Sequence, residues 1–507
     1  MPTVAAIDPV TRLEGHLKVE VTIDIVNGVQ QVVDAKTSGT LFRGFESILL
    51  NRDPNDAQHI TQRVCGVCPV AHGLAAVLAL DSMAKVTIPA NARIMRNLVL
   101  GANFIQSHIL HFYHLSLPDY LDGPNMPPWQ PSWKSDKRLS AAATSTLVGH
   151  YVTALDMRRK AHEMGALFGG RLPDPPAYIS GGMTTTPRAD RITKFNAYLN
   201  ELIPFISSTY LPDVEILAAA YGDYSALGGG AGNLLAYGVF DQDSAGTTKL
   251  LKRGRLVKGT TGVQTVDLNA IAEQVKYSWY ADTTNNLKPS AGVTTPQYPK
   301  TNAYSWLKAP RYSGLPYETG ALARMKVNGD YTGGVSVLDR HRARAREALK
   351  VAQALQTWVG QLQTTGAVYT APTLPGNATA YGLTEAPRGA IGHWVQIANG
   401  KISRYQIITP TCWNASPRDN TGTRGPIEQA LIGTPVKDLN EPVEVVRVIH
   451  SFDPCLSCAV HVMRPAEGVK LFTLGHYHSE DEVYTHDHGD GHTHAHSHTE
   501  GAHHHEG

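Results

Sequence analysis

Four of the five cysteines in this 507-residue chain form two C-x-x-C pairs, Cys65/Cys68 and Cys455/Cys458. A C-x-x-C pair presents two sulfurs at a separation suited to one metal ion or one redox disulfide. Two pairs together supply four thiolates, the number of donors that a soft metal centre requires. We therefore predict that the two pairs meet in the fold and hold a metal.

The spacing of the pairs leaves the kind of site open. Cys68 and Cys455 are 387 positions apart, whereas the pairs of a local zinc ribbon are separated by about 15–20 residues. A structural four-cysteine zinc site with a long insertion remains an alternative at this point. Two independent redox pairs are a further alternative, less favoured because neither pair follows a thioredoxin-like βαβ pattern.

The composition is that of an ordinary globular protein, with 42% hydrophobic and 18% charged residues and a formal net charge of +1. This charge gives no electrostatic reason to expect a nucleic acid or an anionic membrane as partner. No apolar run of about 18 residues is present, so we predict no transmembrane segment. The N-terminus has neither the basic region nor the apolar stretch of a signal peptide, which taken alone favours the cytoplasm.

Most of the chain between the cysteine pairs is predicted to be helical. The segments with few glycines or prolines and with helix-like apolar spacing are 70–85, about 89–117, about 136–167, about 188–220 and about 337–365. Helices of this length predict a bundle at the core. Residues 222–335 are rich in Gly, Thr, Tyr and Pro and predict irregular structure with short strands.

Strand patterns lie near both ends of the chain. Residues 16–36 alternate around an Asn27-Gly28 turn, and residues 394–408 do so around Asn399-Gly400, which predicts two hairpins. We expect a small sheet formed by both ends to bring the cysteine pairs together. The predicted fold class is α+β and mainly helical, with a long-helix bundle core and small peripheral β-sheets built partly from both chain ends.

The segment from about residue 475 differs in composition. Eleven of the 23 histidines lie between His476 and His505, interleaved with Asp, Glu, Gly and Thr. Such a segment cannot build a core, so we expect it to be disordered unless it binds metal. A purification tag is one interpretation, but the spaced, mixed pattern favours a native segment.

The residues that flank the cysteines help to decide which kind of site the two pairs form. The stretches RVCGVCPVAH (63–72) and DPCLSCAVH (453–461) closely resemble the two metal-binding signatures of the nickel-iron hydrogenase large subunit. The resemblance covers nearly the whole chain to His461. Further motifs appear in the family's order: RLEGH (12–16), KAPRY (308–312), EAPRG (385–389) and PTCWNASPR (410–418). The resemblance implies the large-subunit fold, with one catalytic domain over residues 1–461.

The same resemblance implies a ligand role for each cysteine of the pairs. Cys65 and Cys455 would be terminal ligands of nickel, while Cys68 and Cys458 would also bridge to an iron that carries cyanide and carbonyl. Thiolates are soft donors that suit the redox chemistry of nickel. The implied reaction is the reversible heterolytic cleavage of H2, with the metal as Lewis acid and a nearby base as proton acceptor.

Four further residues match catalytic positions of the family. Glu14 would be the first proton relay, whereas without the resemblance it would be a solvated glutamate before a strand. Arg388 would lie over the open metal position and donate to a cyanide nitrogen. Asp119 and Asp453 would hold Arg388 in place; a helix cap or a turn is the usual role of an isolated Asp.

Two polar residues are implied next to the nickel-iron group. Thr411 matches the hydroxyl residue that donates to the second cyanide. His72 lies four positions after Cys68, on the same face if a helix begins at Pro69, so it could donate to a bridging sulfur. The alternative for His72 is a satisfied core histidine.

A second metal site of the magnesium type is implied by Glu46, the carbonyl of Ile407 and His461, because oxygen donors with several waters suit Mg²⁺.

Cys412 departs from the family, which more often has a small hydroxyl residue there, and we interpret it as a buried structural thiol near the active site. Asp174 stands where relatives often have histidine. The run His108, His111 and His114 drifts around a helix and is interpreted as packing or hydrogen-bonding residues.

Cys412 alone remains outside the two pairs, which is too few for an iron–sulfur cluster with its need of about four ligands. The resemblance supplies a small subunit that carries them, in an obligate heterodimer whose signal exports the folded pair. The expected location is the periplasmic face of the cytoplasmic membrane, as in the uptake branch, with a membrane cytochrome b or another quinone-linked subunit as a further partner. Nickel-insertion proteins and a maturation protease are also implied, and residues 462–507 would be the extension that this protease removes from the unprocessed chain.

Two other readings belong to different classes of protein. The quinone-site subunit of respiratory complex I shares ancestry with this family but typically lacks the four nickel cysteines. A zinc-stabilised or nickel-storing protein would explain the cysteines and the His-rich segment without catalysis.

Overall fold

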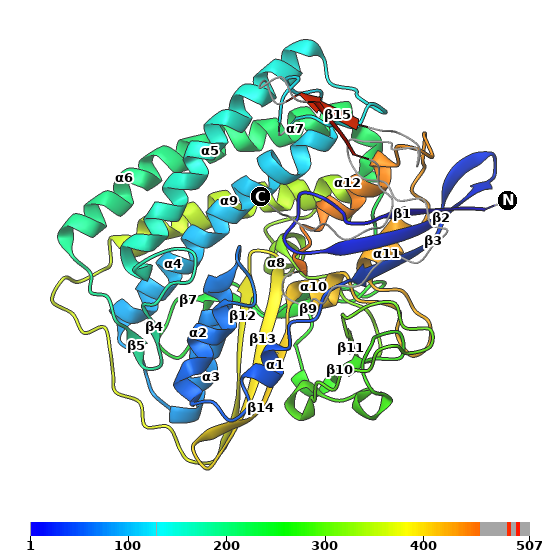
Figure 1. Cartoon of the computed structure of the whole chain (residues 1–507). Coiled ribbons are helices and arrows are strands. Elements are labelled where there is room, and N and C mark those ends of the chain that lie inside the picture. Colours follow the sequence, from blue (N-terminus) through cyan, green and yellow to red (C-terminus); the bar gives the residue numbers. More distant parts are fainter. Residues whose placement is uncertain (1, 128, 457–483, 488–492, 497–507) are drawn as a thin grey trace.

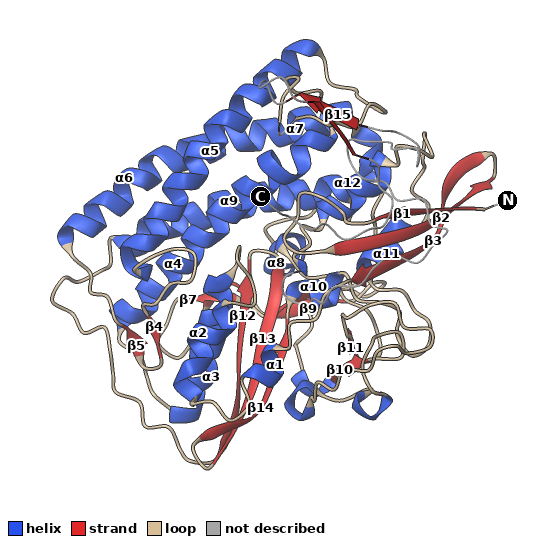
Figure 2. Cartoon of the chain, in the orientation of Figure 1, coloured by secondary structure: helices blue, strands red, loops and turns tan. Residues whose placement is uncertain are grey.

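The computed structural model describes residues 2–127, 129–456, 484–487 and 493–496 (Figure 1). Long helices occupy one side of the molecule and the two three-stranded sheets lie on the other, with short helices between them (Figure 2). The predicted α+β class with a helical core is confirmed.

The core is a bundle of long helices. Its members are α4 (Ala90–Ile109), α5 (Ala141–Gly169), α6 (Ala189–Phe205), α7 (Leu211–Ala220) and α9 (Val337–Val359). α4 packs against both α5 and α9, and nearly all of its side chains are buried. It continues through a π-helical segment, η2 (Leu110–Ser116), into a 3-10 turn that ends at Asp119.

The ends of the helices follow from local chemistry. α5 begins at Ala141 rather than near residue 136, because the Ser140 side chain accepts a hydrogen bond from the Ala143 amide and caps the helix there. The predicted helix over about 188–220 is continuous, but its middle is a π-helical segment, η4 (Ile206–Tyr210), which begins two residues after Pro204. Proline has no amide proton to donate, so the regular hydrogen-bond ladder is interrupted there.

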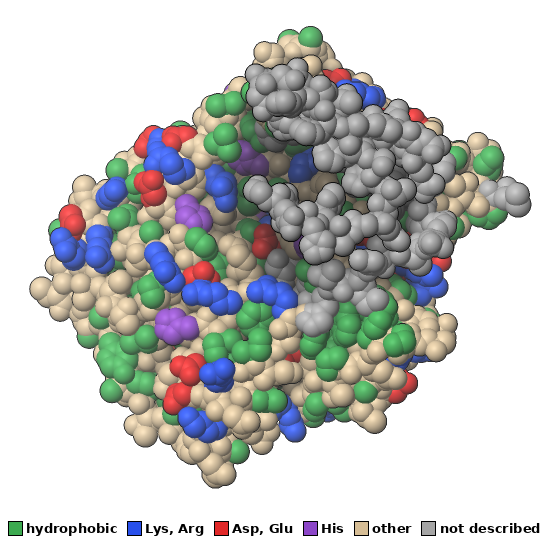
Figure 3. All heavy atoms as spheres, in the orientation of Figure 1, with side chains coloured by type: hydrophobic (Ala, Val, Ile, Leu, Met, Phe, Trp, Pro, Cys, Tyr) green, Lys and Arg blue, Asp and Glu red, His purple; other side chains and the backbone are tan. Residues whose placement is uncertain are grey.

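By length and composition alone, the continuous helix Ala189–Ala220 could cross a membrane. It packs against α5 and α9 within the bundle, as a core helix does. On the face drawn in Figure 3, cationic and anionic side chains are interspersed, in keeping with the net charge of +1.

Two antiparallel three-stranded sheets contain the predicted hairpins. One is β1 (Thr3–Ile7), β2 (Leu17–Val26) and β3 (Val29–Gly39); the other is β12 (Ala378–Ala386), β13 (Gly389–Ala398) and β14 (Lys401–Ile408). The turn residues Asn27, Gly28, Asn399 and Gly400 all have positive φ, as tight hairpin turns require. Both hairpins are therefore confirmed.

The expectation of one sheet formed by both chain ends is wrong. Each hairpin acquires its third strand locally, from β1 or from β12, so the two hairpins never pair. The chain ends meet instead through an isolated parallel bridge between Glu14 and Cys455. A second isolated bridge joins Gln31 to Pro435.

The remaining elements surround the bundle, and all but α3, which has 16 residues and matches the predicted helix over 70–85, are short. The helices are α1 (Phe45–Ile48), α2 (Ala57–Gln62), α3 (Pro69–Ala84), α8 (Ala321–Asn328), α10 (Pro410–Asn414), α11 (Pro426–Leu431) and α12 (Val443–Ser451). The strands are β4 (Tyr178–Ile179), β5 (Gly182–Met183), β6 (Leu234–Ala236), β7 (Val239–Asp241), β8 (Lys249–Leu251), β9 (Gly254–Leu256), β10 (Ile271–Gln274) and β11 (Ala309–Tyr312). Six of these strands, β6–β11, fall within residues 222–335, as the sequence predicts.

Within the C-terminal extension, the structure describes only β15 (Tyr484–Asp487) and β16 (Thr493–His496), which pair antiparallel. The disorder expected from the composition of the extension stays a prediction. The rest of the extension lies outside the described residues.

A buried ion cluster ties the bundle to the second sheet. Arg324 on α8 donates to both carboxylate oxygens of Glu347 on α9, at 2.7 and 2.6 Å, and to Glu385 on β12 at 2.8 Å. His108 of α4 lies 2.7 Å from Glu347. All four side chains are fully buried, so each charge depends on its partners rather than on water.

Replacing Arg324 by methionine should destabilise the protein by about 3–5 kcal/mol, because it leaves buried carboxylates without a counter-charge. Chemical denaturation of the purified protein would measure the loss. The control is Arg342→Met, which removes an exposed pair with Glu215 and should cost no more than about 1 kcal/mol. Equal effects of the two variants would contradict the role assigned to the buried cluster.

Candidate metal centre

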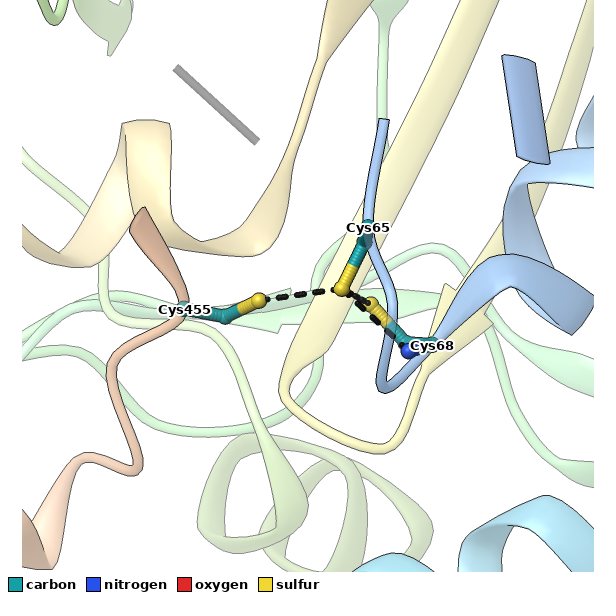
Figure 4. A group of neighbouring side chains, drawn as sticks. All are labelled: Cys65, Cys68 and Cys455. Atoms are coloured by element: carbon teal, nitrogen blue, oxygen red, sulfur yellow. Dashed lines mark hydrogen bonds between the residues drawn. The ribbon is translucent and has the colours of Figure 1, made fainter. Parts of the chain in front are cut away.

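Three of the four paired cysteines meet in the interior, as predicted (Figure 4). The Cys65 sulfur lies 3.1 Å from the Cys455 sulfur and 2.9 Å from that of Cys68. All three cysteines are buried, and none is joined in a disulfide. Cys458 lies outside the described residues. The three sulfurs lie within 4.8 Å of one another, which makes them a candidate ligand set for one metal ion.

The N-terminal pair is held by a tight loop between two helices. Cys65 follows α2, and Cys68 is the residue that immediately precedes α3, where Pro69 occupies the first helical position. The Cys68 amide donates to the Cys65 sulfur at 3.2 Å. The Arg43 guanidinium donates to the carbonyls of Arg63 and Val64, which secures the loop from outside.

Cys455 comes from the other end of the chain, four residues after α12 ends at Ser451. Asp453, two residues before it, has a left-handed φ of 56°, a conformation that Asp tolerates better than most residues. The Cys455 amide donates to Thr411 Oγ1 at 3.0 Å, and the next amide, that of Leu456, donates to the Glu14 carbonyl at 2.5 Å. The segment that carries Cys455 is therefore fastened to α10 and to the N-terminal segment.

Electrostatics favours a bound cation among these sulfurs. Two thiolates 3 Å apart repel each other by about 5 kcal/mol even at an effective dielectric constant of about 20. Arg388 is one nearby counter-charge: burial lowers its pKa, but Asp453 and the thiolates of Cys455, Cys68 and Cys65 raise it by more, so it stays protonated. One guanidinium cannot neutralise three thiolates, and a soft, redox-active metal such as nickel fits both the donor type and the charge.

Arg388 has more N–H groups than it has hydrogen-bond acceptors among the described residues. Its Nη1 donates to Ser107 Oγ at 3.3 Å, and its Nη2 lies 2.9 Å from Oδ1 of Asp453. The contact with Asp453 is an ion pair without hydrogen-bond geometry, so Nε and Nη2 of Arg388 and both carboxylate oxygens of Asp453 are buried without a hydrogen-bond partner among the described residues. Buried N–H groups without acceptors are costly, so these atoms fit acceptors on a group bound at the sulfurs.

A tight turn between β12 and β13 presents Arg388. Arg324 donates to the carbonyls of Ala386 and Pro387, at 2.9 and 2.7 Å, and so clamps the turn from beneath. Gly389 has a φ of 139°, and a Cβ there would lie 2.3 Å from the Thr319 hydroxyl. Only glycine permits this close approach between the turn and Thr319, and the approach fixes the position of the Arg388 backbone.

Asp119 does not contact Arg388, so that part of the prediction is wrong. The carboxylate pairs with Arg12 through Oδ1, and its Oδ2 lies 2.6 Å from Nδ1 of His450. Burial raises the pKa of Asp119, but Arg12 and His450 lower it by more, so it stays ionised. It lies at the end of the helical run from α4, which directs its carboxylate to the loop before β2 rather than to the turn before β13. Asp453 alone of the two acids holds Arg388.

Glu14 lies between the two cysteine segments. Its backbone forms the parallel bridge with Cys455, and its Oε1 would be 3.3 Å from a Cβ placed on Gly66, the residue after Cys65. The carboxylate therefore lies beside the loop of the first pair, which suits a proton acceptor at the centre.

His72 is fully buried in the first turn of α3. Its Nδ1 lies 3.2 Å from Nε2 of His393 on β13, whose Nδ1 in turn lies 2.8 Å from the Tyr405 hydroxyl on β14. Burial lowers the pKa of His72 to about 4, and the Cys65 thiolate opposes this shift. The ring is therefore neutral and close to the sulfur cluster.

A separate cavity of about 60 Å³ contains the residues predicted for the second metal. Glu46 Oε1 accepts from the Ile407 amide at 3.1 Å and from Gln406 at 2.8 Å, so two of the residues predicted to supply ligands lie side by side at this cavity. The third, His461, lies outside the described residues. Cys412 lines this cavity, and burial raises the pKa of its thiol to about 11, as for a structural cysteine.

Several residues of the two sites were not singled out from the sequence as contributors. Glu273 and Lys308 also line the cavity, with Nζ 3.8 Å from Oε2, and burial raises the pKa of Glu273 to about 7. Lys308 belongs to the KAPRY motif that carries the family resemblance, whereas Glu273 lies in a segment without a recognised motif. Arg324 and Ser107 had no signal because their roles come from packing between distant elements.

The minor sequence predictions can also be placed. His108, His111 and His114 each make a hydrogen bond within the bundle, to Glu347, the His450 carbonyl and the Tyr151 carbonyl, so their interpretation as structural residues is confirmed. Asp174 forms an ion pair with Arg63 at 2.5 Å, just before the first cysteine pair.

Comparison with known proteins agrees with this geometry. The family profile for nickel-dependent hydrogenase matches residues 43–132, 124–333 and 329–461, and a HoxL-like profile matches residues 5–33. The chain is 42% identical, over 91% of its length and 96% of the relative's, to the periplasmic [NiFeSe] hydrogenase large subunit of Desulfomicrobium baculatum. It is 33% identical, over 90% and 95%, to the uptake hydrogenase large subunit of Rhizobium leguminosarum bv. viciae.

A solved structure shares the fold. The Ni-Fe-Se hydrogenase from D. vulgaris Hildenborough in the reduced state superposes with a TM-score of 0.87 at 43% identity, covering 91% of this chain and 100% of that one. A buried cysteine centre on this fold defines the catalytic subunit of a metal-dependent hydrogenase. The chain belongs to the nickel-dependent hydrogenase family, as its large subunit. It is an oxidoreductase that acts on hydrogen, and the complex I and metal-storage alternatives are not favoured.

Replacing Cys65 or Cys68 by serine should remove most of the bound nickel. Loss of an outer partner of a metal ligand already costs about 10–100-fold in affinity, and loss of a ligand should cost more. Elemental analysis of the purified protein would measure the nickel content. Cys412→Ser is the matched control, because it alters a buried thiol outside the cluster and should retain nickel; equal loss in all variants would point to misfolding instead.

Proposed function

We propose that this chain is the catalytic subunit of a periplasmic uptake-type nickel-iron hydrogenase, which oxidises H2 and passes the electrons to a small iron–sulfur subunit. The observation that carries the proposal is the buried cluster of Cys65, Cys68 and Cys455 near Arg388, whose Nε and Nη2 lack hydrogen-bond partners in the described part of the chain. The periplasmic and uptake relatives support the location and direction.

In this proposal, all four paired cysteines would hold a nickel-iron group, with Cys68 and Cys458 as ligands of both metals, and the iron would carry carbonyl and cyanide ligands. The chemistry that the bound group supplies is heterolytic cleavage of H2 by a redox-active Lewis acid. Arg388, which is held by Asp453 and by the clamp on its turn, would donate to one cyanide. Thr411 accepts from the Cys455 amide, which leaves its own proton to donate to the other cyanide.

Glu14 accepts the proton in this scheme. Its carboxylate lies beside the first cysteine loop, and its backbone is fixed by the bridge to Cys455, so little reorganisation is needed. Asp119 acts one step further out, where it positions Arg12 and His450.

The test of the function is infrared spectroscopy with elemental analysis. The purified enzyme should contain nickel and iron in near-equal amounts and show the bands of metal-bound carbonyl and cyanide. Zinc alone, without such bands, would contradict the proposal and support a structural four-cysteine site.

The Glu14→Gln variant should lower H2 oxidation by about 10²–10⁴-fold, the usual contribution of a positioned acid–base group, while the infrared bands persist. Amide and carboxylate have similar shapes, so the centre should still assemble. Glu20→Gln is the control, because Glu20 lies on β2 with its side chain beside Lys18 at the surface, and activity should remain. Unaffected turnover in Glu14→Gln would overturn the relay assignment.

We propose a second metal, Mg²⁺ or a similar divalent cation, in the cavity beside Glu46, with the Ile407 carbonyl and His461 as further ligands. Its support is the carboxylate-lined cavity, since Mg²⁺ prefers oxygen ligands and retains several waters. Glu46→Gln should lose this cation and keep nickel, whereas the exposed Glu215→Gln should keep both. Elemental analysis that finds magnesium unchanged in Glu46→Gln would contradict the assignment.

The remaining parts of the proposal concern assembly. The catalytic domain would span residues 1–461, and a maturation protease would remove residues 462–507 after nickel-insertion proteins have loaded the site. A membrane cytochrome b or another quinone-linked subunit would receive the electrons at the periplasmic face of the membrane. A mass spectrum of the active enzyme with its C-terminus at Gly507 would rule out the processing step.

A further inference from the structure

Three buried groups form a hydrogen-bonded series that leads away from the cysteines. They are His72 on α3, His393 on β13 and Tyr405 on β14, linked at 3.2 Å and 2.8 Å. All three are buried, with exposed fractions of 0%, 0% and 3%. Three different elements thus meet at the two histidine rings, and the proposed mechanism makes no use of His393 or Tyr405.

The direction of the hydrogen bonds follows from Tyr405. Its hydroxyl has one hydrogen-bond partner among the described residues, Nδ1 of His393. A buried hydroxyl that did not donate would leave its proton unsatisfied, at a cost of about 1–3 kcal/mol. Tyr405 therefore donates to Nδ1 of His393.

The two rings then pass this direction on. A neutral imidazole carries one proton, so His393, which accepts at Nδ1, must carry its proton at Nε2. That Nε2–H donates to Nδ1 of His72, which places the proton of His72 at its own Nε2. Full burial favours the neutral form of both rings, as the argument requires.

We propose that Tyr405 and His393 are positioning residues that fix His72 as the Nε2–H tautomer, so that the ring presents an N–H donor to the cysteine cluster. The Cys65 thiolate acts on His72 electrostatically, so the ring lies within reach of the cysteine cluster, and Nε2 is the ring nitrogen left to face it because His393 engages Nδ1. The inference rests on the proposed nickel-iron site and extends it by two residues. A donor to a ligand sulfur withdraws electron density from it and so tunes the metals that it binds.

The reverse series would put a lone pair of His72 Nε2 toward the thiolates. In that arrangement His393 would donate to the Tyr405 oxygen, and the tyrosine proton would have no acceptor among the described residues. Both ends of the series would then be unfavourable. The hydroxyl of Tyr405 therefore sets the tautomer of His72, at the opposite end of the series, through His393.

The test uses the intact enzyme and the carbonyl band of its iron. Tyr405→Phe removes the donor and leaves both histidines, so His72 is no longer held in its donor tautomer. The sulfur should then give more electron density to the metals, and the carbonyl band should shift to lower wavenumber. Tyr178→Phe is the matched control: it removes another buried hydroxyl with one partner, the Arg96 carbonyl, and should leave the band in place.

An unshifted carbonyl band in Tyr405→Phe would overturn the inference, and so would an equal shift in Tyr178→Phe. Absence of the band from the wild-type enzyme would instead overturn the proposed function, so the two failures are distinguishable.

Variants of His393 test the same series without changing Tyr405. His393→Gln keeps an N–H donor toward His72 and should keep the wild-type band, whereas His393→Leu should shift it as Tyr405→Phe does. Combining His393→Leu with Tyr405→Phe should give no further shift, because both act through one tautomer. A wild-type band in His393→Leu, or additive shifts in the double variant, would overturn the inference.

Discussion

The repulsion among closely spaced sulfurs is the constraint to which the rest of the interior responds. Three cysteine side chains within 4.8 Å of one another, shielded from water, cannot all be thiolates unless positive charge is placed beside them. The protein supplies one such charge, Arg388, and fixes it with Asp453 on one side and a clamped turn on the other. The metal completes the neutralisation.

The arginine clamp shows how far this constraint reaches into the fold. Arg324 touches no sulfur, yet it joins α8, α9 and β12 and holds the carbonyls of the turn that carries Arg388. Its own charge is balanced by Glu347 and Glu385, both fully buried. Removing one member leaves the others uncompensated, so stability and the geometry of the site depend on the same few contacts.

The sequence predicted those features that short-range patterns encode. Long helices follow from apolar spacing, and both hairpins follow from their Asn-Gly turns. The meeting of the cysteine pairs was predicted from their unusual pairing, and the family motifs then supplied Arg388, Thr411 and Glu14. Glu46 and Ile407, which the resemblance assigned to one metal site, line the same cavity.

What the sequence did not reveal depends on contacts between distant elements. The bridge between Glu14 and Cys455 replaced the expected common sheet, because each hairpin completed its sheet with a neighbouring strand. Asp119 faces Arg12 rather than Arg388, because the length of the helical run that continues α4 determines where Asp119 lies. No local pattern distinguishes these arrangements from their alternatives.

The bridge between Glu14 and Cys455 also sets an order of events during synthesis. At about 5–20 residues per second, the ribosome needs roughly 20–80 s to travel from the first cysteine pair to the second. During that interval the first dithiol has no partner strand, and exposed thiolates are the forms most prone to oxidation. Closing so long a loop costs about 5 kcal/mol in chain entropy, and packing of the intervening bundle must supply most of that. A newly made chain therefore has reason to be shielded by another protein until its last segment arrives.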